Sequence, residues 1–107
     1  MIEKAATTDQ SVALEARFKT LVTRWKSERG VTSSATQMAM HPAYQRLIGL
    51  GPDAVPLLLR ELQREPDHWF WALGAITGEN PVPPEARGNV PEMAKAWIEW
   101  GRNQGLI

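Results

Sequence analysis

The apolar residues of this chain recur at intervals of three and four along most of its length, which is the period of an α-helix. No stretch alternates apolar and polar residues as a half-buried strand does. The pattern predicts an all-α protein, a compact bundle of five or six short helices. We expect residues 1–8 to form a flexible tail and residues 9–107 to form a single domain.

The first helix is expected to run from about Gln10 to Glu28, with Asp9 as its N-terminal cap and Gly30 ending it. Long basic side chains flank its apolar stripe on both sides, where they typically cover the edge of a core. A docking surface for an acidic partner is the functional alternative. The stripe consists of Leu14, Phe18, Leu21, Val22 and Trp25, flanked by Arg17 and Arg24 on one side and by Lys19 and Lys26 on the other.

Two short helices are expected next. Residues 31–36 contain a turn and several residues that can cap a helix. His41 precedes a proline, which disfavours the helical conformation, so we expect a break there. Pro42 suits the first position of the following helix, which continues to about Ile48. The candidate caps are Ser33, Ser34 and Thr36.

The centre of the chain is predicted to be a pair of helices. Pro52 opens the first, which we expect to reach about Arg64, with Pro56 bending it near its start. Pro66 ends that helix, and Asp67 is expected to cap the second one.

The second helix of the pair, residues 69–77, is apolar on almost every face. Trp71 lies on the face roughly opposite to Trp69. A helix of this kind is covered on more than one side, so we expect the first and last helices of the chain to cover it. Trp71 is then either part of the core or an exposed anchor for a partner.

After Gly78, a loop of residues 79–88 contains three prolines and is expected to be stiff and extended. Asn89 should cap a last helix of about residues 90–103, and Gly105 should end it. The apolar face of this helix consists of Met93, Ala94, Trp97, Ile98 and Trp100.

Residues 50–62, with the Pro66-Asp67 turn and the helix of residues 69–76, resemble a HEAT repeat. Such repeats have a first helix bent by an internal proline, an aspartate at the turn and a second apolar helix; Pro56 and Asp67 occupy those positions here. The arginine expected near the start of the second helix is replaced by Phe70 or Trp71. The resemblance implies a HEAT-like helical hairpin in the middle of the bundle, with the flanking helices as caps.

Motifs spread over residues 25–107 resemble a family of small uncharacterised bacterial helical proteins. The resemblance implies a compact helical domain of mobile-element or toxin–antitoxin type, and it assigns no catalytic residue. The motifs are Ser33-Ser34, His41-Pro42-Ala43-Tyr44-Gln45, residues 68–78, Pro81-Val82-Pro83, Arg87-Gly88 and Trp97-Ile98-Glu99-Trp100-Gly101.

Twelve basic and twelve acidic side chains balance, and the chain has no cysteine. Zero net charge gives no overall attraction for nucleic acid or for an anionic membrane, and disulfide and thiolate chemistry are excluded. His41 and His68 lack a metal-binding spacing, and the serines lack a nucleophile context. We therefore expect no catalytic site, metal or cofactor. No secretory or membrane-spanning segment is recognisable, so we expect a cytoplasmic protein.

These exclusions favour a non-catalytic protein-interaction module, antitoxin- or immunity-like, whose partner is another protein such as the product of a neighbouring gene. Rigid aromatic anchors beside a stiff loop lose little freedom on binding. The less favoured alternative is a nucleic-acid-associated regulator that uses the basic first helix, including Arg29; no membrane partner is expected. The candidate partner-binding residues are Trp71, His68, Pro83, Arg87, Arg17, Lys19, Arg24 and Lys26.

Overall fold

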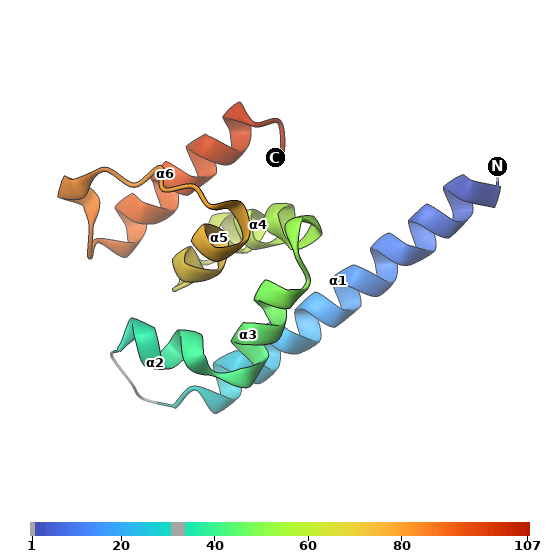
Figure 1. Cartoon of the computed structure of the whole chain (residues 1–107), viewed down its shortest axis with the longest axis horizontal. Helices are drawn as coiled ribbons and strands as arrows, with labels where there is room; N and C mark the ends of the chain where they lie inside the picture. The colour runs from blue at the N-terminus through green and yellow to red at the C-terminus, as the bar shows by residue number, and fades with distance from the viewer. Residues whose placement is uncertain (1, 31–33) are drawn as a thin grey trace.

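The computed structural model describes the backbone of residues 2–30 and 34–107, and the side chains of residues 10–30 and 34–107. Within these ranges it contains six α-helices and no strand (Figure 1), which confirms the predicted all-α bundle. The helices are α1 (Ile2–Glu28), α2 (Ala35–Met40), α3 (Pro42–Gly49), α4 (Val55–Arg64), α5 (Phe70–Thr77) and α6 (Val90–Asn103); two 3₁₀ turns are η1 (Pro52–Ala54) and η2 (Pro84–Ala86).

The helices pack in an order that differs from their order along the chain. α3 packs on α1 and on α5, and α4 packs on α5 and on α6. α1 and α6 therefore lie on opposite sides of the molecule, and the N-terminal part of α1 extends beyond the other helices (Figure 1). The main neighbours of α5 are α3 and α4, and not the first and last helices that we expected to cover it.

The start of α1 differs from the prediction. The helix begins at Ile2, so Asp9 lies inside it and is not its cap. No glycine or proline interrupts residues 2–9, and Ala5 and Ala6 are strong helix formers, so the helix continues through the aspartate. Its end agrees with the prediction, because Gly30 follows the last turn with a φ of 69°.

The caps of α2 and α3 come from the residues that the sequence indicated. The Oγ atom of Ser34 accepts a hydrogen bond from the Gln37 N–H at 3.2 Å. His41 breaks the helix, and its Nδ1 accepts from the Ala43 N–H at 3.0 Å, so the histidine caps α3. Residues 31–33, where we expected a turn and one of the candidate caps, lie outside the described residues.

The helix expected from Pro52 to Arg64 consists of two elements. η1 forms one 3₁₀ turn, and α4 then begins at Val55 with Pro56 as its second residue. A proline in the first turn lacks only an N–H that would have no partner within the helix. Pro56 therefore fits the first turn of α4 and does not bend the helix. The helices α4 and α5 contact each other, while their likeness to a HEAT repeat stays a prediction.

The C-terminal helix agrees closely with the prediction. The Asn89 side chain caps α6 by accepting from the Glu92 N–H at 3.2 Å. Gly105, with a φ of 73°, ends the helix, and the Leu106 N–H donates to the Gly101 carbonyl at 2.9 Å. This turn returns the chain end onto α6.

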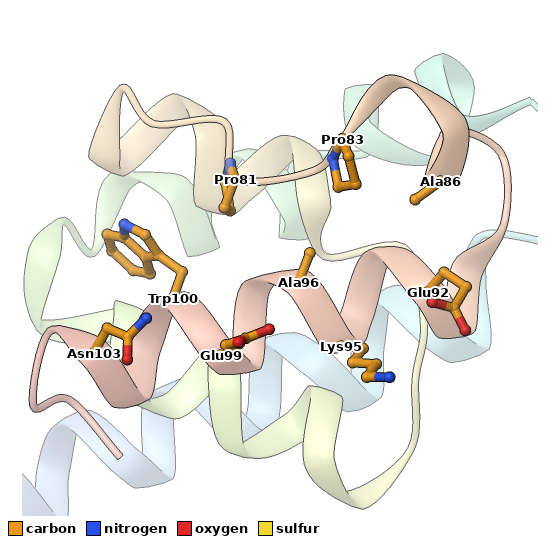
Figure 2. Close-up of a pocket in the computed structure, with 9 residues that line it drawn as sticks. All are labelled: Pro81, Pro83, Ala86, Glu92, Lys95, Ala96, Glu99, Trp100 and Asn103. Atoms are coloured by element: carbon orange, nitrogen blue, oxygen red, sulfur yellow. The ribbon is translucent and has the colours of Figure 1, made fainter.

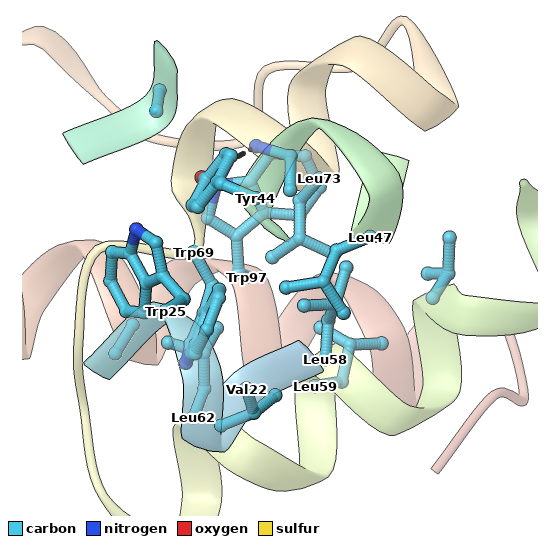
Figure 3. Packing of buried hydrophobic residues seen from close by; sticks show 14 of the residues in the cluster. Val22, Trp25, Tyr44, Leu47, Leu58, Leu59, Leu62, Trp69, Leu73 and Trp97 are labelled. Carbon is cyan, nitrogen blue, oxygen red and sulfur yellow. Dashed lines mark hydrogen bonds between the residues drawn. The ribbon is translucent and has the colours of Figure 1, made fainter. Parts of the chain in front are cut away.

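Three aromatic side chains from distant parts of the sequence form the centre of the core. Trp25 of α1 lies 4.5 Å from Trp69 and 5.4 Å from Tyr44 between ring centroids, and Tyr44 stacks on Trp69 at 5.8 Å. Leucines of α3, α4 and α5 surround this aromatic cluster, together with Trp97 (Figure 3). Trp100 is partly buried and packs against this core, so Trp71 is the tryptophan that lies outside it.

Candidate partner-binding site

Trp71 is exposed on α5. Its side chain is 46% exposed, whereas Trp69, Ala72 and Leu73 on the other side of the same segment are fully buried. α5 is therefore covered on one side only, although its sequence is apolar on almost every side. Trp71 is therefore not a core residue, while its role as an anchor for a partner stays a prediction.

Tyr44 fixes the N-terminal end of α5 from the neighbouring helix α3. Its hydroxyl oxygen accepts a hydrogen bond from the Ala72 N–H, the third N–H of the helix, and its O–H donates to the His68 carbonyl, both at 2.9 Å. The hydroxyl thus performs the part of an N-terminal cap, which the side chain of a preceding residue usually performs. Burial raises the pKa of the Tyr44 hydroxyl above its ordinary value, because the phenolate would lose its water.

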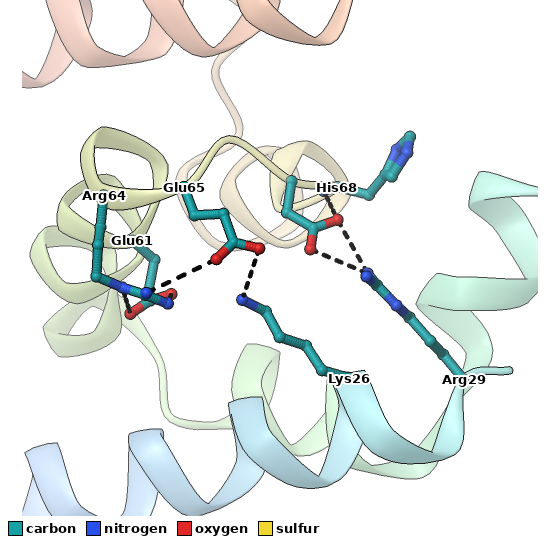
Figure 4. A network of polar contacts seen from close by, with 7 residues as sticks. Lys26, Arg29, Glu61, Arg64, Glu65 and His68 are labelled. Atoms are coloured by element: carbon teal, nitrogen blue, oxygen red, sulfur yellow. Dashed lines mark hydrogen bonds and ion pairs between the residues drawn. The ribbon is translucent and has the colours of Figure 1, made fainter.

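Asp67 does not cap α5, contrary to the prediction. It is 8% exposed, and its carboxylate accepts from the His68 N–H at 2.7 Å and from the Arg29 guanidinium at 2.9 and 3.1 Å. Arg29 in turn lies over the ring of Trp25, 4.3 Å from the ring centroid. The ion pair of Asp67 with Arg29 joins the segment before α5 to the end of α1 (Figure 4).

His68 has a fixed backbone and a half-buried ring. Its N–H and its carbonyl bond to Asp67 and Tyr44, as given above. The ring points away from the ion pairs (Figure 4) and stands edge-on to Phe70, with 6.5 Å between the ring centroids. His68 and Trp71 lie three residues apart. The Tyr44 hydroxyl holds the turn that contains both, because it bonds to the His68 carbonyl and to the Ala72 N–H.

The proline-rich loop and α6 enclose a groove of about 470 Å³ (Figure 2). Pro81 and Pro83 lie on one side of it, and Trp100, which is half-buried, lies on the other. Val82 and Ala86 are buried and attach the loop to the core. Residues 84–86 form the 3₁₀ turn η2, so the loop is not extended throughout as expected. Arg87 ends that turn and is exposed.

The basic residues predicted as a binding set have different surroundings. The Lys26 ammonium lies 3.6 Å from the Glu65 carboxylate (Figure 4). The Arg24 Nε lies 3.3 Å from the Glu28 carboxylate. Arg17 and Lys19 are exposed and have no ion pair with any residue of the described part of the chain. Arg17 and Arg24 line one groove, and Pro83 lines another.

Three ion pairs of the described residues link separate elements: Lys26 with Glu65, Arg29 with Asp67, and His41 with Glu28. The His41 Nε2 lies 3.1 Å from Glu28, far from any second histidine in the sequence. No group of three or more metal-ligating side chains occurs among the described residues. None of the helices in that part of the chain combines the length and apolar content that a membrane span requires.

Comparisons with models of protein families, with curated proteins and with solved structures find no match to this chain.

Two residues on these surfaces were not among the sequence candidates. Arg46 of α3 lines the same groove as Arg17 and Arg24 of α1, and Trp100 lines the groove of the proline-rich loop. The helical period placed Trp100 on an apolar face, but no local signal relates Arg46 to the arginines of α1. Only the packing of α3 on α1 brings these three together.

Proposed function

We propose that this chain is a non-catalytic protein-interaction module that binds another protein through the exposed side of α5. An antitoxin- or immunity-like role is the concrete form of the proposal, with the product of a neighbouring gene as the partner.

Exposure of Trp71 is the observation that carries the proposal. Tryptophan is the residue type most enriched among the residues that dominate binding energy at protein interfaces. The opposite side of the Trp71 segment packs in the core through the buried residues Trp69, Ala72 and Leu73. Tyr44 holds the N-terminus of α5 by a hydrogen bond. A partner that covers Trp71 therefore gains apolar contact while ordering little additional chain.

Nucleic-acid binding by the basic first helix remains the alternative function. It has less support, because Lys26 and Arg29 of the predicted basic set are committed to Glu65 and Asp67. A gel shift at about 50 mM salt tests it, since the electrostatic attraction of nucleic acid is strongest at low salt.

The Trp71→Ala variant tests the proposed function. We expect its melting temperature to remain close to that of the native chain, because surface substitutions usually change stability by about 0.5 kcal/mol or less. Trp69→Ala should instead destabilise the chain by about 3–5 kcal/mol, as truncations of buried aromatic residues do. The co-expressed product of the neighbouring gene should co-purify with the native chain and much less with Trp71→Ala.

The matched control is Met40→Ala, which truncates another large apolar side chain that is 53% exposed. This variant should retain the partner. Equal loss of the partner by Met40→Ala, or a fall in stability of several kcal/mol for Trp71→Ala, would contradict the assignment of Trp71 as the anchor.

A further inference from the structure

α1 and α3 lie along each other and leave a groove of about 630 Å³ between them. The long helix supplies two arginines to this groove, spaced two turns apart, and α3 supplies a third. Among the described residues, no carboxylate lines it. The lining residues are Arg17, Thr20, Leu21, Arg24, Arg46, Gly49 and Leu50.

The positive charge of this groove is largely uncompensated. Arg17 and Arg46 have no ion pair among the described residues. Arg24 contacts Glu28 through its Nε alone, at 3.3 Å, which leaves both terminal nitrogens of the guanidinium available. Lys26 and Arg29 of the same helix end instead face the acidic residues Glu65 and Asp67 of the segment before α5.

A second hollow continues the groove toward the N-terminus of α1. Arg17 lines both hollows, so they are adjacent. Along α1 the combined groove reaches from Gln10 to Arg24, roughly 20 Å at the rise of an α-helix. The far end contains an acidic residue, Asp53, beside Leu14.

We propose that this groove binds an acidic peptide segment of the partner protein, with its carboxylates on the three arginines and its apolar side chains against the half-buried Leu50. The proposal rests on the proposed function and names the chemistry of the partner. Guanidinium groups present paired N–H donors that match a carboxylate.

A peptide fits these surroundings better than a nucleic acid. A phosphate backbone carries its charge without interruption and needs a row of outward-facing cations. Here leucines lie between the arginines, Asp53 lies near one end, and the whole chain has no net charge. Alternating carboxylates and aliphatic side chains satisfy both parts of the lining.

The experiment measures fluorescence anisotropy of labelled peptides added to the full chain. The probe is a peptide of about twelve residues in which glutamate and leucine alternate, enough to follow the groove whether the peptide is extended or helical. The comparison ligands are the same peptide with glutamine for glutamate and an oligothymidine of equal charge. We expect the glutamate peptide to bind at least about tenfold more tightly than either, and more weakly as salt rises.

Arg46→Glu is the decisive variant, because it changes a residue on the less basic of the two helices. It should weaken binding of the glutamate peptide at least about tenfold, since it replaces attraction by repulsion. Lys19→Glu is the matched control: it makes the same charge change on an exposed residue of α1 that is not part of either lining, and should change binding little. Circular dichroism and a thermal melt verify that both variants fold.

Three results would overturn the proposal: no binding of the glutamate peptide, equal weakening by Arg46→Glu and Lys19→Glu, or tighter binding of the oligothymidine. The proposed function fails separately. If Trp71→Ala loses the neighbouring gene product and Arg46→Glu retains it, α5 is the binding surface and the groove is not used. If Arg46→Glu also loses it, the groove is part of the interface.

Discussion

A single tyrosine connects three segments of the chain. Tyr44 belongs to α3, its ring stacks on Trp69, and its hydroxyl bridges the His68 carbonyl and the Ala72 N–H. The hydroxyl stands between two groups four residues apart at the start of α5, where the first helix N–H groups have no acceptor within the helix. The orientation of the helix that presents Trp71 thus depends on one hydroxyl group.

Tyr44→Phe removes this hydroxyl and keeps the ring. We expect a loss of about 1–3 kcal/mol in the free energy of unfolding, because a part-buried carbonyl and a buried N–H lose their partner together. Urea denaturation followed by circular dichroism measures it. A loss no larger than that of an exposed substitution would contradict the role of the hydroxyl.

The same residue predicts a dependence on alkaline pH. Burial raises the pKa of Tyr44 in the folded state above that of the unfolded chain, so its contribution is fully present below the unfolded pKa of about 10 and declines as pH rises beyond it. The native chain should therefore lose more stability above about pH 10 than Tyr44→Phe does. Tyr44 is the only tyrosine in the sequence, so tyrosinate absorbance reports its ionisation directly.

At the scale of an element, α6 approaches α4 closely at a glycine. A Cβ atom on Gly101 would lie 2.5 Å from Leu59 Cδ1 and 3.3 Å from Ile107 Cγ1. Glycine costs a helix about 1 kcal/mol relative to alanine. Here the missing side chain lets a buried leucine of α4 and the C-terminal residue meet the helix.

Gly101→Ala should destabilise the chain by about 1–2 kcal/mol, because the cost of overpacking exceeds the gain in helix propensity. Gly74→Ala in α5 is the matched control, since the nearest atom to its added Cβ is the Glu79 carbonyl oxygen at 3.8 Å. That variant should be neutral or more stable. Thermal melts of the two variants measured together give the comparison, and a stabilising Gly101→Ala would refute close contact at this point.

At the scale of the whole molecule, two ion pairs of the described residues join the end of α1 to the segment before α5, and the one with a buried carboxylate is Arg29–Asp67. Arg29 follows α1, and Asp67 precedes α5, 38 residues later. The aspartate is buried while the arginine is partly exposed. Breaking such a pair leaves a charge with little access to water, which costs more than breaking a pair on the surface.

Asp67→Asn should lower the free energy of unfolding by roughly 2–3 kcal/mol, between the values typical of exposed and of buried pairs. Glu65→Gln removes a carboxylate two residues away that contacts Lys26 and Arg64 on the surface, and it should cost less than about 1 kcal/mol. Denaturant titration of both variants separates them. Equal effects would mean that Asp67 acts as an ordinary surface charge.

Features that depend on neighbouring residues in the sequence were predictable. Ser34 and Asn89 cap their helices, His41 separates two helices, and Gly30 and Gly105 end two others, because each of these signals acts within one turn of backbone. The helical period also identified the buried face of α1 and of α6.

Features that depend on packing were not predictable. Asp67 is a residue type that commonly caps helices, but here its carboxylate accepts hydrogen bonds from Arg29. Tyr44 of α3 caps α5 in its place. The same holds for the candidate groove, since Arg46 meets Arg17 only when α3 packs on α1. The sequence could indicate that Trp71 faced away from Trp69, but not which neighbours α5 would have.

The aromatic cluster of Trp25, Tyr44 and Trp69 has a consequence for cooperativity. Its members come from α1, α3 and the start of α5, so a cut anywhere between residues 25 and 69 would divide the cluster. Neither half could then fold as an independent unit, and we expect the core to unfold in one step. A partner bound at α5 would accordingly stabilise α1 as much as the helix it touches, because its binding free energy is added to the unfolding of the whole domain.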